Sequence, residues 1–267
     1  MLAEAGLKAA DVLGVGIGAP GPLGISAGVV RDMPNLPGFR NVPLRDRVAA
    51  GLGLRAVLEN DANAAALGEY LCGVGRSGGD MVLLTLGTGV GSGIIINGKI
   101  LHGVHEMGAE LGHVIVEPGG ESCGCGQRGC LERYASATYL AQYAARQVRQ
   151  GRKSSLEGIL KAKDALNARD VNEARKAGDA LAAEVWDRAA YYLAIACVDI
   201  CRAFDPERIV LAGGMTQAGE DLLRPVQEHF RRLHWSITEP MTRIVISELG
   251  NDAGVIGAAG VAWQALT

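Results

Sequence analysis

The sequence has no long apolar run, few aromatic residues and no large excess of charge of either sign. The missing apolar run excludes membrane-spanning helices, which need about 20 consecutive apolar residues. The formal net charge of −3 arises from 26 basic and 29 acidic side chains, so a broad basic surface for nucleic acid is excluded as well. With 267 residues, 48% hydrophobic and 4% aromatic, the chain is long enough to bury a core and to form two domains.

The N-terminus also lacks the basic segment followed by an apolar segment that marks a secretory signal peptide. We therefore expect a cytoplasmic protein whose thiols stay reduced. Three of its cysteines, Cys72, Cys197 and Cys201, stand singly in apolar helical contexts. These three are predicted to be small core residues.

Strand-like and helix-like segments alternate along the chain, which predicts an α/β fold with largely buried sheets. The strands are expected at 12–17, 55–59, 81–86, 94–96, 209–211 and 244–246, and the helices at 44–50, 62–72, 137–150, 179–204, 220–233 and 253–266. A stretch rich in glycine and serine, 73–80, is the best candidate for a domain boundary. We therefore expect a smaller α/β domain of residues 1–74 plus about 255–267 and a larger one of residues 75–254.

One histidine and three cysteines form the most specific feature of the sequence. His113 precedes Cys123, Cys125 and Cys130, with glycines between the cysteines; these are the ligands and tight turns of a closed tetrahedral Zn²⁺ site. A disulfide between Cys125 and Cys130 is the alternative, which a reducing compartment disfavours. Four protein ligands leave no open position for substrate, so the zinc is expected to be structural.

Two glycine-rich segments differ from known phosphate loops. Residues 93–100 nearly spell a P-loop, but Ile100 stands where Ser or Thr should hold magnesium, and the interior is a β-branched strand. Residues 86–93 lack the dinucleotide-binding spacing and precede a strand, not a helix. The turn Gly87-Thr88-Gly89 between two strands could bring backbone N–H groups close to an anion. A purely structural hairpin with bulges is the alternative.

The segment Asn60-Asp61-Ala62-Asn63 follows the expected strand 55–59 and opens the helix 62–72. Asn and Asp at the start of a helix are ordinary N-caps. The carboxyl end of a sheet strand is also where α/β proteins place their ligand-binding and catalytic groups. The position of Asp61 fits both interpretations.

Several motifs, in this order along the chain, resemble the ROK family of sugar kinases and repressors, in particular its bacterial glucokinases. They are Gly16-Ile-Gly18-Ala-Pro20-Gly21-Pro22, Pro34-Asn35-Leu-Pro-Gly38, Glu59-Asn60-Asp61-Ala-Asn63, Leu86-Gly-Thr-Gly-Val-Gly91, Glu110-Leu-Gly-His113 and Cys123-Gly-Cys125-Gly-Gln-Arg-Gly-Cys130-Leu-Glu132. The cysteine motif is highly specific, and the glycine motifs are weak singly. The resemblance implies a two-domain actin-like or hexokinase-like (ribonuclease H-like) ATPase fold with a structural zinc loop.

The same resemblance implies ATP-dependent phosphorylation of a hexose, with glucose first and N-acetylglucosamine or N-acetylmannosamine as alternatives. It makes Asp61 the general base, and it assigns the sugar hydroxyls to Asn35, Asn60, Asp61, Glu110, His113 and Glu132. It brings Thr88 and Gly89 to the phosphates and Gly213 and Gly214 to the adenosine of ATP, which Mg²⁺ accompanies. For Glu110 and Glu132, support of the zinc loop is the alternative.

The sequence departs from the family at its N-terminus. Family members begin with a strand and a hairpin that carry an Asp-x-Gly-Gly-Thr phosphate loop, so we expect on the order of 40 preceding residues to be missing. Residues 1–10 are then expected to be helical, and the strand at 12–17 to expose an apolar edge. Electrostatic stabilisation is usually the largest catalytic term, so a chain without that loop is expected to be impaired.

Two other functions stay open. One is a sugar-sensing ROK regulator, although the winged-helix DNA-binding segment of such regulators is missing from the sequence. The other is a non-catalytic, zinc-stabilised sugar-binding fragment. In each case the resemblance implies a homodimer or homotetramer.

Overall fold

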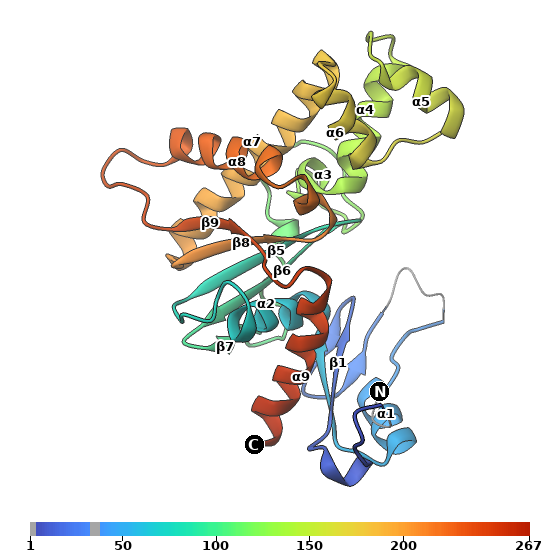
Figure 1. Cartoon of the computed structure of the whole chain (residues 1–267), viewed down its shortest axis with the longest axis vertical. Helices are drawn as coiled ribbons and strands as arrows, with labels where there is room; N and C mark the ends of the chain where they lie inside the picture. Colours follow the sequence, from blue (N-terminus) through green and yellow to red (C-terminus); the bar gives the residue numbers. More distant parts are fainter. Residues whose placement is uncertain (1–3, 33–37) are drawn as a thin grey trace. The chain divides into compact units, whose positions relative to one another are not determined.

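The structure, a computed structural model, describes residues 4–32 and 38–267 (Figure 1). The chain divides into two compact units: the first comprises 1–83, 93–109 and 248–267, and the second comprises 84–92 and 110–247. This division differs from the expected domains, because 75–83, 93–109 and 248–254 belong to the first unit. Residues 93–109 belong to the first unit through contacts between residues far apart in the sequence, such as the one between His102 and Glu59. Local sequence patterns do not predict such contacts.

The first unit contains a parallel pair of strands and a short hairpin. Strand β1 (Val15–Ala19) runs parallel to β4 (Ala56–Asn60), with Ile17 opposite Leu58. Strands β2 (Leu23–Gly24) and β3 (Val29–Val30) form the antiparallel hairpin, and helix α1 (Leu44–Leu52) precedes β4. Between these elements lies a small core that contains Ala19, Leu23, Val30 and Leu58.

Two helices of the first unit pack at unusually close range. Helix α2 (Asp61–Cys72) lies against α9 (Ala253–Leu266). A Cβ atom on Gly257 of α9 would lie 1.6 Å from the carbonyl oxygen of Ala64 in α2. A Cβ atom on Gly16 of β1 would likewise lie 1.7 Å from the carbonyl oxygen of Ala258. Glycine is therefore required at both positions, because only a residue without Cβ permits this backbone approach.

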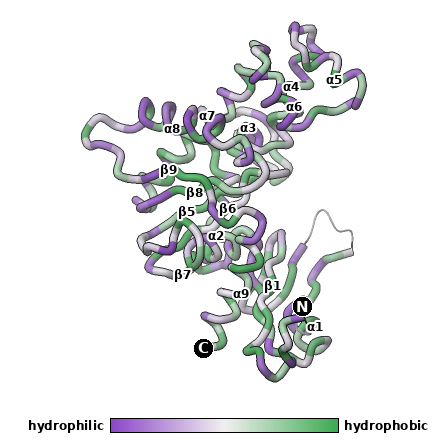
Figure 2. The backbone as a smooth tube through the Cα atoms, in the orientation of Figure 1, coloured by the Kyte–Doolittle hydropathy of each residue, from purple (hydrophilic) through white to green (hydrophobic). Residues whose placement is uncertain are grey.

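The largest sheet has five strands in the order β7-β6-β5-β8-β9. Their bounds are Met81–Leu86 for β5, Val90–Ile96 for β6, Lys99–Ile100 for β7, Arg208–Ala212 for β8 and Arg243–Ile246 for β9. Strand β8 runs parallel to β9, and β6 is antiparallel to β7, so the sheet is mixed. Strands β5 and β8 are almost entirely buried and mostly hydrophobic in Figure 2, as expected for central strands covered on both faces.

The second unit is rich in helices. They are α3 (Glu132–Ala135), α4 (Ala137–Arg149), α5 (Leu156–Lys163), α6 (Ala168–Lys176), α7 (Ala180–Phe204) and α8 (Glu220–Leu233). The 25-residue α7 buries an apolar stripe that includes Leu181, Val185 and Ala189, and it packs against α8. Two short 3₁₀ turns, Leu111–His113 and Gly214–Ala218, directly follow the predicted site residues Glu110 and Gly213.

Every strand and helix expected at a stated range between 12 and 266 is present, with ends shifted by a few residues. The short elements β2, β3, β7, α3, α5 and α6 were not expected. The expected helix at 1–10 is wrong over its described part: residues 4–10 form a turn and the beginning of a 3₁₀ turn, because Gly6 takes a φ of +68° that interrupts a helix. Within the described residues, we find no helix that combines the length and the apolar character needed to span a membrane.

Candidate functional site

The junction between β4 and α2 presents the predicted catalytic carboxylate. Asn60 ends the strand, and its Oδ1 accepts hydrogen bonds from the backbone N–H groups of Ala62 (2.9 Å) and Asn63 (3.2 Å). Asp61 is the first residue of α2 and is exposed; its Oδ1 also accepts from the N–H of Ala62 at 2.9 Å. The N-cap interpretation is thus confirmed for Asn60, and the cap leaves Asp61 at the surface.

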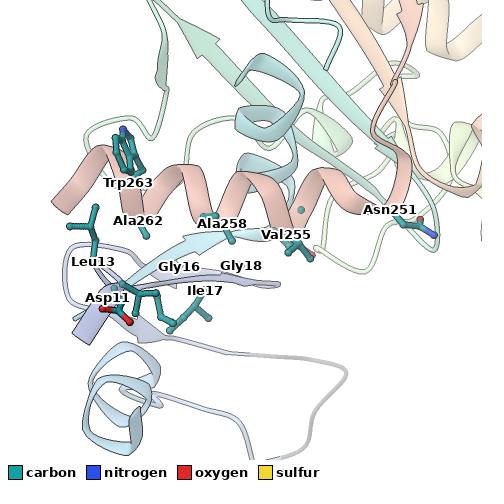
Figure 3. A pocket seen from close by; sticks show the side chains of 16 residues that line it. Asp11, Leu13, Gly16, Ile17, Gly18, Asn251, Val255, Ala258, Ala262 and Trp263 are labelled. Atoms are coloured by element: carbon teal, nitrogen blue, oxygen red, sulfur yellow. The ribbon is translucent and has the colours of Figure 1, made fainter. Parts of the chain in front are cut away.

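Asp61 also borders a groove of about 830 Å³ in the first unit. Figure 3 shows β1 along one side of this groove and α9 along the other. Its walls are mainly apolar, with Ile17, Val255, Ala258 and Trp263 among the lining residues. Within the described residues β1 pairs only with β4, so its other edge has no strand partner.

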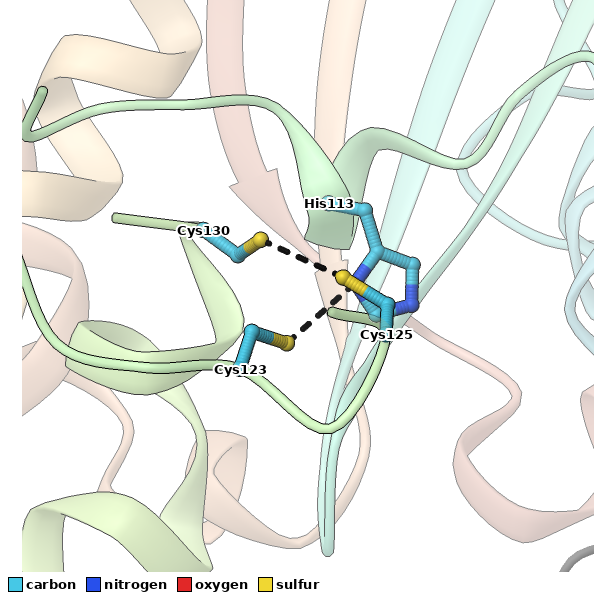
Figure 4. A group of neighbouring side chains, drawn as sticks. All are labelled: His113, Cys123, Cys125 and Cys130. Carbon is cyan, nitrogen blue, oxygen red and sulfur yellow. Dashed lines mark hydrogen bonds between the residues drawn. The ribbon is translucent and has the colours of Figure 1, made fainter. Parts of the chain in front are cut away.

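The predicted metal ligands come together in the second unit. One ring nitrogen of His113 and the Sγ atoms of Cys123, Cys125 and Cys130 all lie within 4.8 Å of one another (Figure 4). The Cys123 sulfur lies 3.7 Å from His113 Nδ1, and the sulfurs of Cys125 and Cys130 are 3.6 Å apart. Tetrahedral Zn–S bonds of about 2.3 Å place sulfurs roughly 3.8 Å apart, so the donor set fits Zn²⁺. The expected alternative, a disulfide, is not formed, because all six cysteines are free.

The three thiols of this cluster differ in pKa, and only that of Cys125 is lowered. Burial raises the pKa of Cys125, but hydrogen bonds from the side chain and backbone of Gln127 and from the neighbouring thiols outweigh burial and lower it to about 6. A thiolate is therefore available at Cys125 near neutral pH. Burial instead raises the pKa of Cys123, and it raises the pKa of Cys130 to about 12. The second ring nitrogen of His113 points away from the sulfurs (Figure 4). The imidazole can thus hold a metal through Nδ1 and offer Nε2 to another group.

The glycine turn between β5 and β6 is bound directly by Glu132. Its Oε2 accepts a hydrogen bond from the N–H of Val90 at 3.1 Å. A Cβ atom on Gly89 would lie 2.2 Å from the same oxygen, so the turn needs glycine there. The expected strand, turn and strand are confirmed, and Glu132 is hydrogen-bonded to the first residue of the second strand.

Two further glycines bring predicted residues to the same turn. A Cβ atom on Gly112, which lies between Glu110 and His113, would be 1.9 Å from the carbonyl oxygen of Val90. Gly213, with a φ of +89°, would place a Cβ atom 2.8 Å from the carbonyl oxygen of Leu86. The second unit therefore gathers the metal ligands, Glu132 and both glycine turns.

The predicted site residues are distributed between the two units. Asn60 and Asp61 lie in the first unit; the second contains Thr88, Gly89, Glu110, His113, Cys123, Cys125, Cys130, Glu132, Gly213 and Gly214. Asn35 lies outside the described residues. Sequence reasoning missed His102, whose ring contacts buried Glu59 next to Asn60. Its only sequence signal is a polar ring residue shortly after a strand, which is too common to single it out.

Comparison with known proteins shows one family throughout. The ROK family profile matches residues 1–265. A glucokinase of Halalkalibacterium halodurans is 43% identical over 255 residues, which cover 95% of this chain and 77% of that protein. A ROK hexokinase structure from Thermus thermophilus superposes with a TM-score of 0.86 at 34% identity, covering 99% of this chain and 82% of the other. A ROK glucokinase of Streptomyces griseus, solved with glucose and AMPPNP, superposes with a TM-score of 0.83 at 36% identity. The match covers 98% of this chain and 84% of the other.

Proposed function

The chain belongs to the ROK family, and we propose that it transfers the γ-phosphoryl group of ATP to a hexose, with glucose as the first candidate. The observation that carries the proposal is the exposed carboxylate of Asp61, held at the junction of β4 and α2 by the Asn60 cap. The likeness to a glucokinase solved with glucose and an ATP analogue supports the choice of both substrates.

In the proposed reaction Asp61 acts as the general base. Its carboxylate accepts the proton of the attacking sugar hydroxyl while that oxygen bonds to the γ-phosphorus of ATP and the bond to the ADP oxygen breaks. Phosphoryl transfer has a loose transition state, so most of the catalysis comes from positioning and from charge neutralisation. Mg²⁺ enters with ATP as part of the substrate and neutralises charge on the phosphates.

The other side chains bind and orient the substrates. Hexose hydroxyls are assigned to Asn35, Asn60, Asp61, Glu110, His113 and Glu132; Thr88 and Gly89 are assigned to the phosphates, and Gly213 and Gly214 to the adenosine. The geometry supports a double role for Glu132, because only one of its oxygens is engaged by the Val90 N–H. An acidic residue that holds the glycine turn and binds the sugar would align acceptor and donor.

The metal site is proposed to hold one structural Zn²⁺ on His113, Cys123, Cys125 and Cys130. When bound, zinc supplies a closed tetrahedral crosslink, and it has no open position for Lewis-acid chemistry. The crosslink would fix the backbone on either side of the cysteine loop. The bond from His113 Nδ1 to the zinc would also fix the orientation of the imidazole ring, with Nε2 left for the sugar.

The proposal also covers the cellular compartment and the oligomeric state of the protein. Three free thiols in one metal site suit a reducing compartment, so we place the protein in the cytoplasm. We further propose a homodimer or homotetramer, which sedimentation of the purified protein would test.

The direct experiment measures ADP release from Mg-ATP with a panel of sugars that contains glucose, mannose, N-acetylglucosamine and N-acetylmannosamine. Turnover with glucose at the highest kcat/KM is the expected result. Calorimetric titration with glucose in the absence of ATP gives binding separately. Glucose binding without turnover on any sugar would contradict the kinase and leave a sugar-binding protein or regulator as the function.

A further inference from the structure

A buried carboxylate lies directly beneath Asn60 and Asp61. Glu59 is only 1% exposed, although Asn60, the last residue of β4, and exposed Asp61, the first residue of α2, directly follow it. Its Oε1 accepts hydrogen bonds from the backbone N–H of Asn60 at 2.8 Å and from Nδ2 of Asn63 at 2.9 Å. One oxygen of Glu59 therefore binds both ends of the four-residue segment that contains Asp61.

The second oxygen of Glu59 is paired with an imidazole from another part of the chain. His102 follows β7, and its Nε2 lies 2.7 Å from Glu59 Oε2. The hydrogen bond to Glu59 raises the pKa of His102 and outweighs the opposing effect of burial. His102 therefore donates to Glu59 as a cation over a wider pH range than a free histidine would.

The loop that carries His102 is fastened on both sides. The N–H of Leu101 donates to the carbonyl oxygen of Ile94 at 2.9 Å, and the N–H of Gly108 donates to the carbonyl oxygen of His102 at 2.8 Å. Further along the loop, the Glu106 carboxylate accepts from the N–H groups of Ile25 (2.8 Å) and Ser26 (2.9 Å). His102 is thus a fixed partner for Glu59.

Stability alone is a weak explanation for this pair. Desolvation of a buried ion pair offsets much of its attraction, so apolar side chains of similar volume often stabilise a core as well. The pair instead supplies directed hydrogen bonds to one short segment. Through Asn60 and Asn63, those bonds restrict the backbone from which the Asp61 carboxylate projects.

We infer that Glu59 and His102 are positioning residues for phosphoryl transfer. They hold the Asn60–Asn63 segment so that the Asn60 amide and the Asp61 carboxylate meet the acceptor hydroxyl in one orientation. The inference rests on the proposed function, because it assigns Asp61 to the reacting hydroxyl. Neither Glu59 nor His102 needs to touch the substrate.

The test compares two substitutions of His102. His102→Ala removes the donor to Glu59, whereas His102→Gln retains an amide N–H of similar reach. We expect His102→Ala to lower kcat by about 10- to 100-fold, since small misplacements of reacting groups cost up to about that factor, and to raise the KM for the sugar. The KM for ATP should stay unchanged, and His102→Gln should recover most of the lost kcat.

A matched control comes from a second histidine–carboxylate pair. His229 Nε2 lies 2.7 Å from Asp187 Oδ1 in the second unit, and His229→Gln should leave kcat and both KM values unchanged. All rates are normalised to active sites, with circular dichroism and the melting temperature recorded for each variant. A merely structural role would lower the melting temperature or the active fraction without changing the sugar KM.

Glu59→Gln tests the same inference if His102→Ala fails to fold. The glutamine keeps a carbonyl acceptor for Asn60, but its NH₂ group cannot accept a hydrogen bond from protonated His102. A folded protein is therefore expected with a raised sugar KM and a lowered kcat. If the parent is active and kcat and the sugar KM are unchanged in folded Glu59→Gln or His102→Ala, this inference is overturned. The proposed function would stand. A parent that neither binds nor phosphorylates any hexose would overturn the proposed function and this inference with it.

Discussion

The carboxylate of Glu69 binds the backbone of Leu249: its Oε1 accepts the Leu249 N–H at 2.8 Å, although the residues are 180 positions apart in the sequence. The other oxygen accepts from the N–H groups of Val74 (3.1 Å) and Glu248 (3.3 Å). Glu69 is fully buried. One side chain thereby anchors the segment after α2 and the segment that leads into α9, and the expected boundary segment 73–80 is held at its beginning.

Glu69→Gln should therefore destabilise the protein. The amide presents N–H groups where one carboxylate oxygen accepts, so a buried backbone donor loses its partner at a cost of about 1–3 kcal/mol. Urea denaturation would measure the change in free energy of unfolding. Glu248→Gln is the control, because the exposed pair between Glu248 and Arg76 contributes about 1 kcal/mol at most. Equal effects of the two variants would contradict the role of Glu69.

Asp61→Asn should retain the fold and lose activity. Asparagine keeps the acceptor for the Ala62 N–H but cannot take a proton, and loss of a general base lowers kcat by about 10²- to 10⁴-fold. Steady-state ADP release with glucose would measure the loss. Asp46→Asn, at an exposed position of α1, is the control and should leave kcat unchanged. A kcat for Asp61→Asn within a few-fold of the parent would remove Asp61 from the mechanism.

The packing of α2 against α9 predicts opposite outcomes for two glycines in one helix. Gly257→Ala places a methyl group on the backbone of Ala64 and should cost about 1–3 kcal/mol or more through overpacking. A Cβ atom on Gly254 would meet no other atom within 4 Å, and Gly254→Ala should stabilise by at most about 1 kcal/mol through helix propensity. Melting temperatures would test this: that of Gly257→Ala should fall below the parent's, and that of Gly254→Ala should rise above it.

Metal analysis tests the cysteine cluster. Protein purified without chelator should contain one zinc per chain, and Cys130→Ser should contain far less and melt at a lower temperature. The reason is that a structural zinc contributes on the order of 10 kcal/mol in isolated zinc peptides. Cys72, which was predicted to lie in the core, is exposed and lies outside the cluster, so Cys72→Ser should keep the metal. Full zinc content in Cys130→Ser would exclude Cys130 as a ligand.

Asp179, the N-cap of α7, predicts a loss of stability in acid. Burial raises its pKa, but hydrogen bonds from Ala182, Ser155 and Ser154 outweigh burial and lower it from 3.8 to about 2. Because the folded-state pKa lies below the ordinary value, ionised Asp179 stabilises the folded state above about pH 3.8. That stabilisation disappears as the pH falls toward about 2.

Asp179→Asn should lower the free energy of unfolding by about 1 kcal/mol at neutral pH, as expected for a weakened cap. The difference from the parent should shrink between about pH 4 and pH 2, where the parent carboxylate gains its proton. Urea titrations at several pH values would follow it. Asp164→Asn, at a fully exposed position, should show no such trend, and a constant difference for Asp179→Asn would contradict the assignment.

Local patterns in the sequence predicted the long elements and the metal ligands. A continuous apolar run located β5, which is buried on both faces, and helical periodicity located α7, which buries one apolar stripe. The cysteine loop was equally readable, since Cys123, Cys125 and Cys130 lie within eight positions and close their turns with glycine. The short strands β2 and β7 escaped prediction because two residues carry no period.

The sequence by itself determined the family, the grouping of His113 with three cysteines and the cap at Asn60, because each depends on residues close together in the chain. Only the tertiary structure decided that His102 supports Glu59, that Glu69 holds Leu249 and that Glu132 binds the turn at Val90. The physical reason is distance along the chain. A hydrogen bond between residues 42 to 180 positions apart leaves no pattern in either segment, and it exists only once the fold has brought them together.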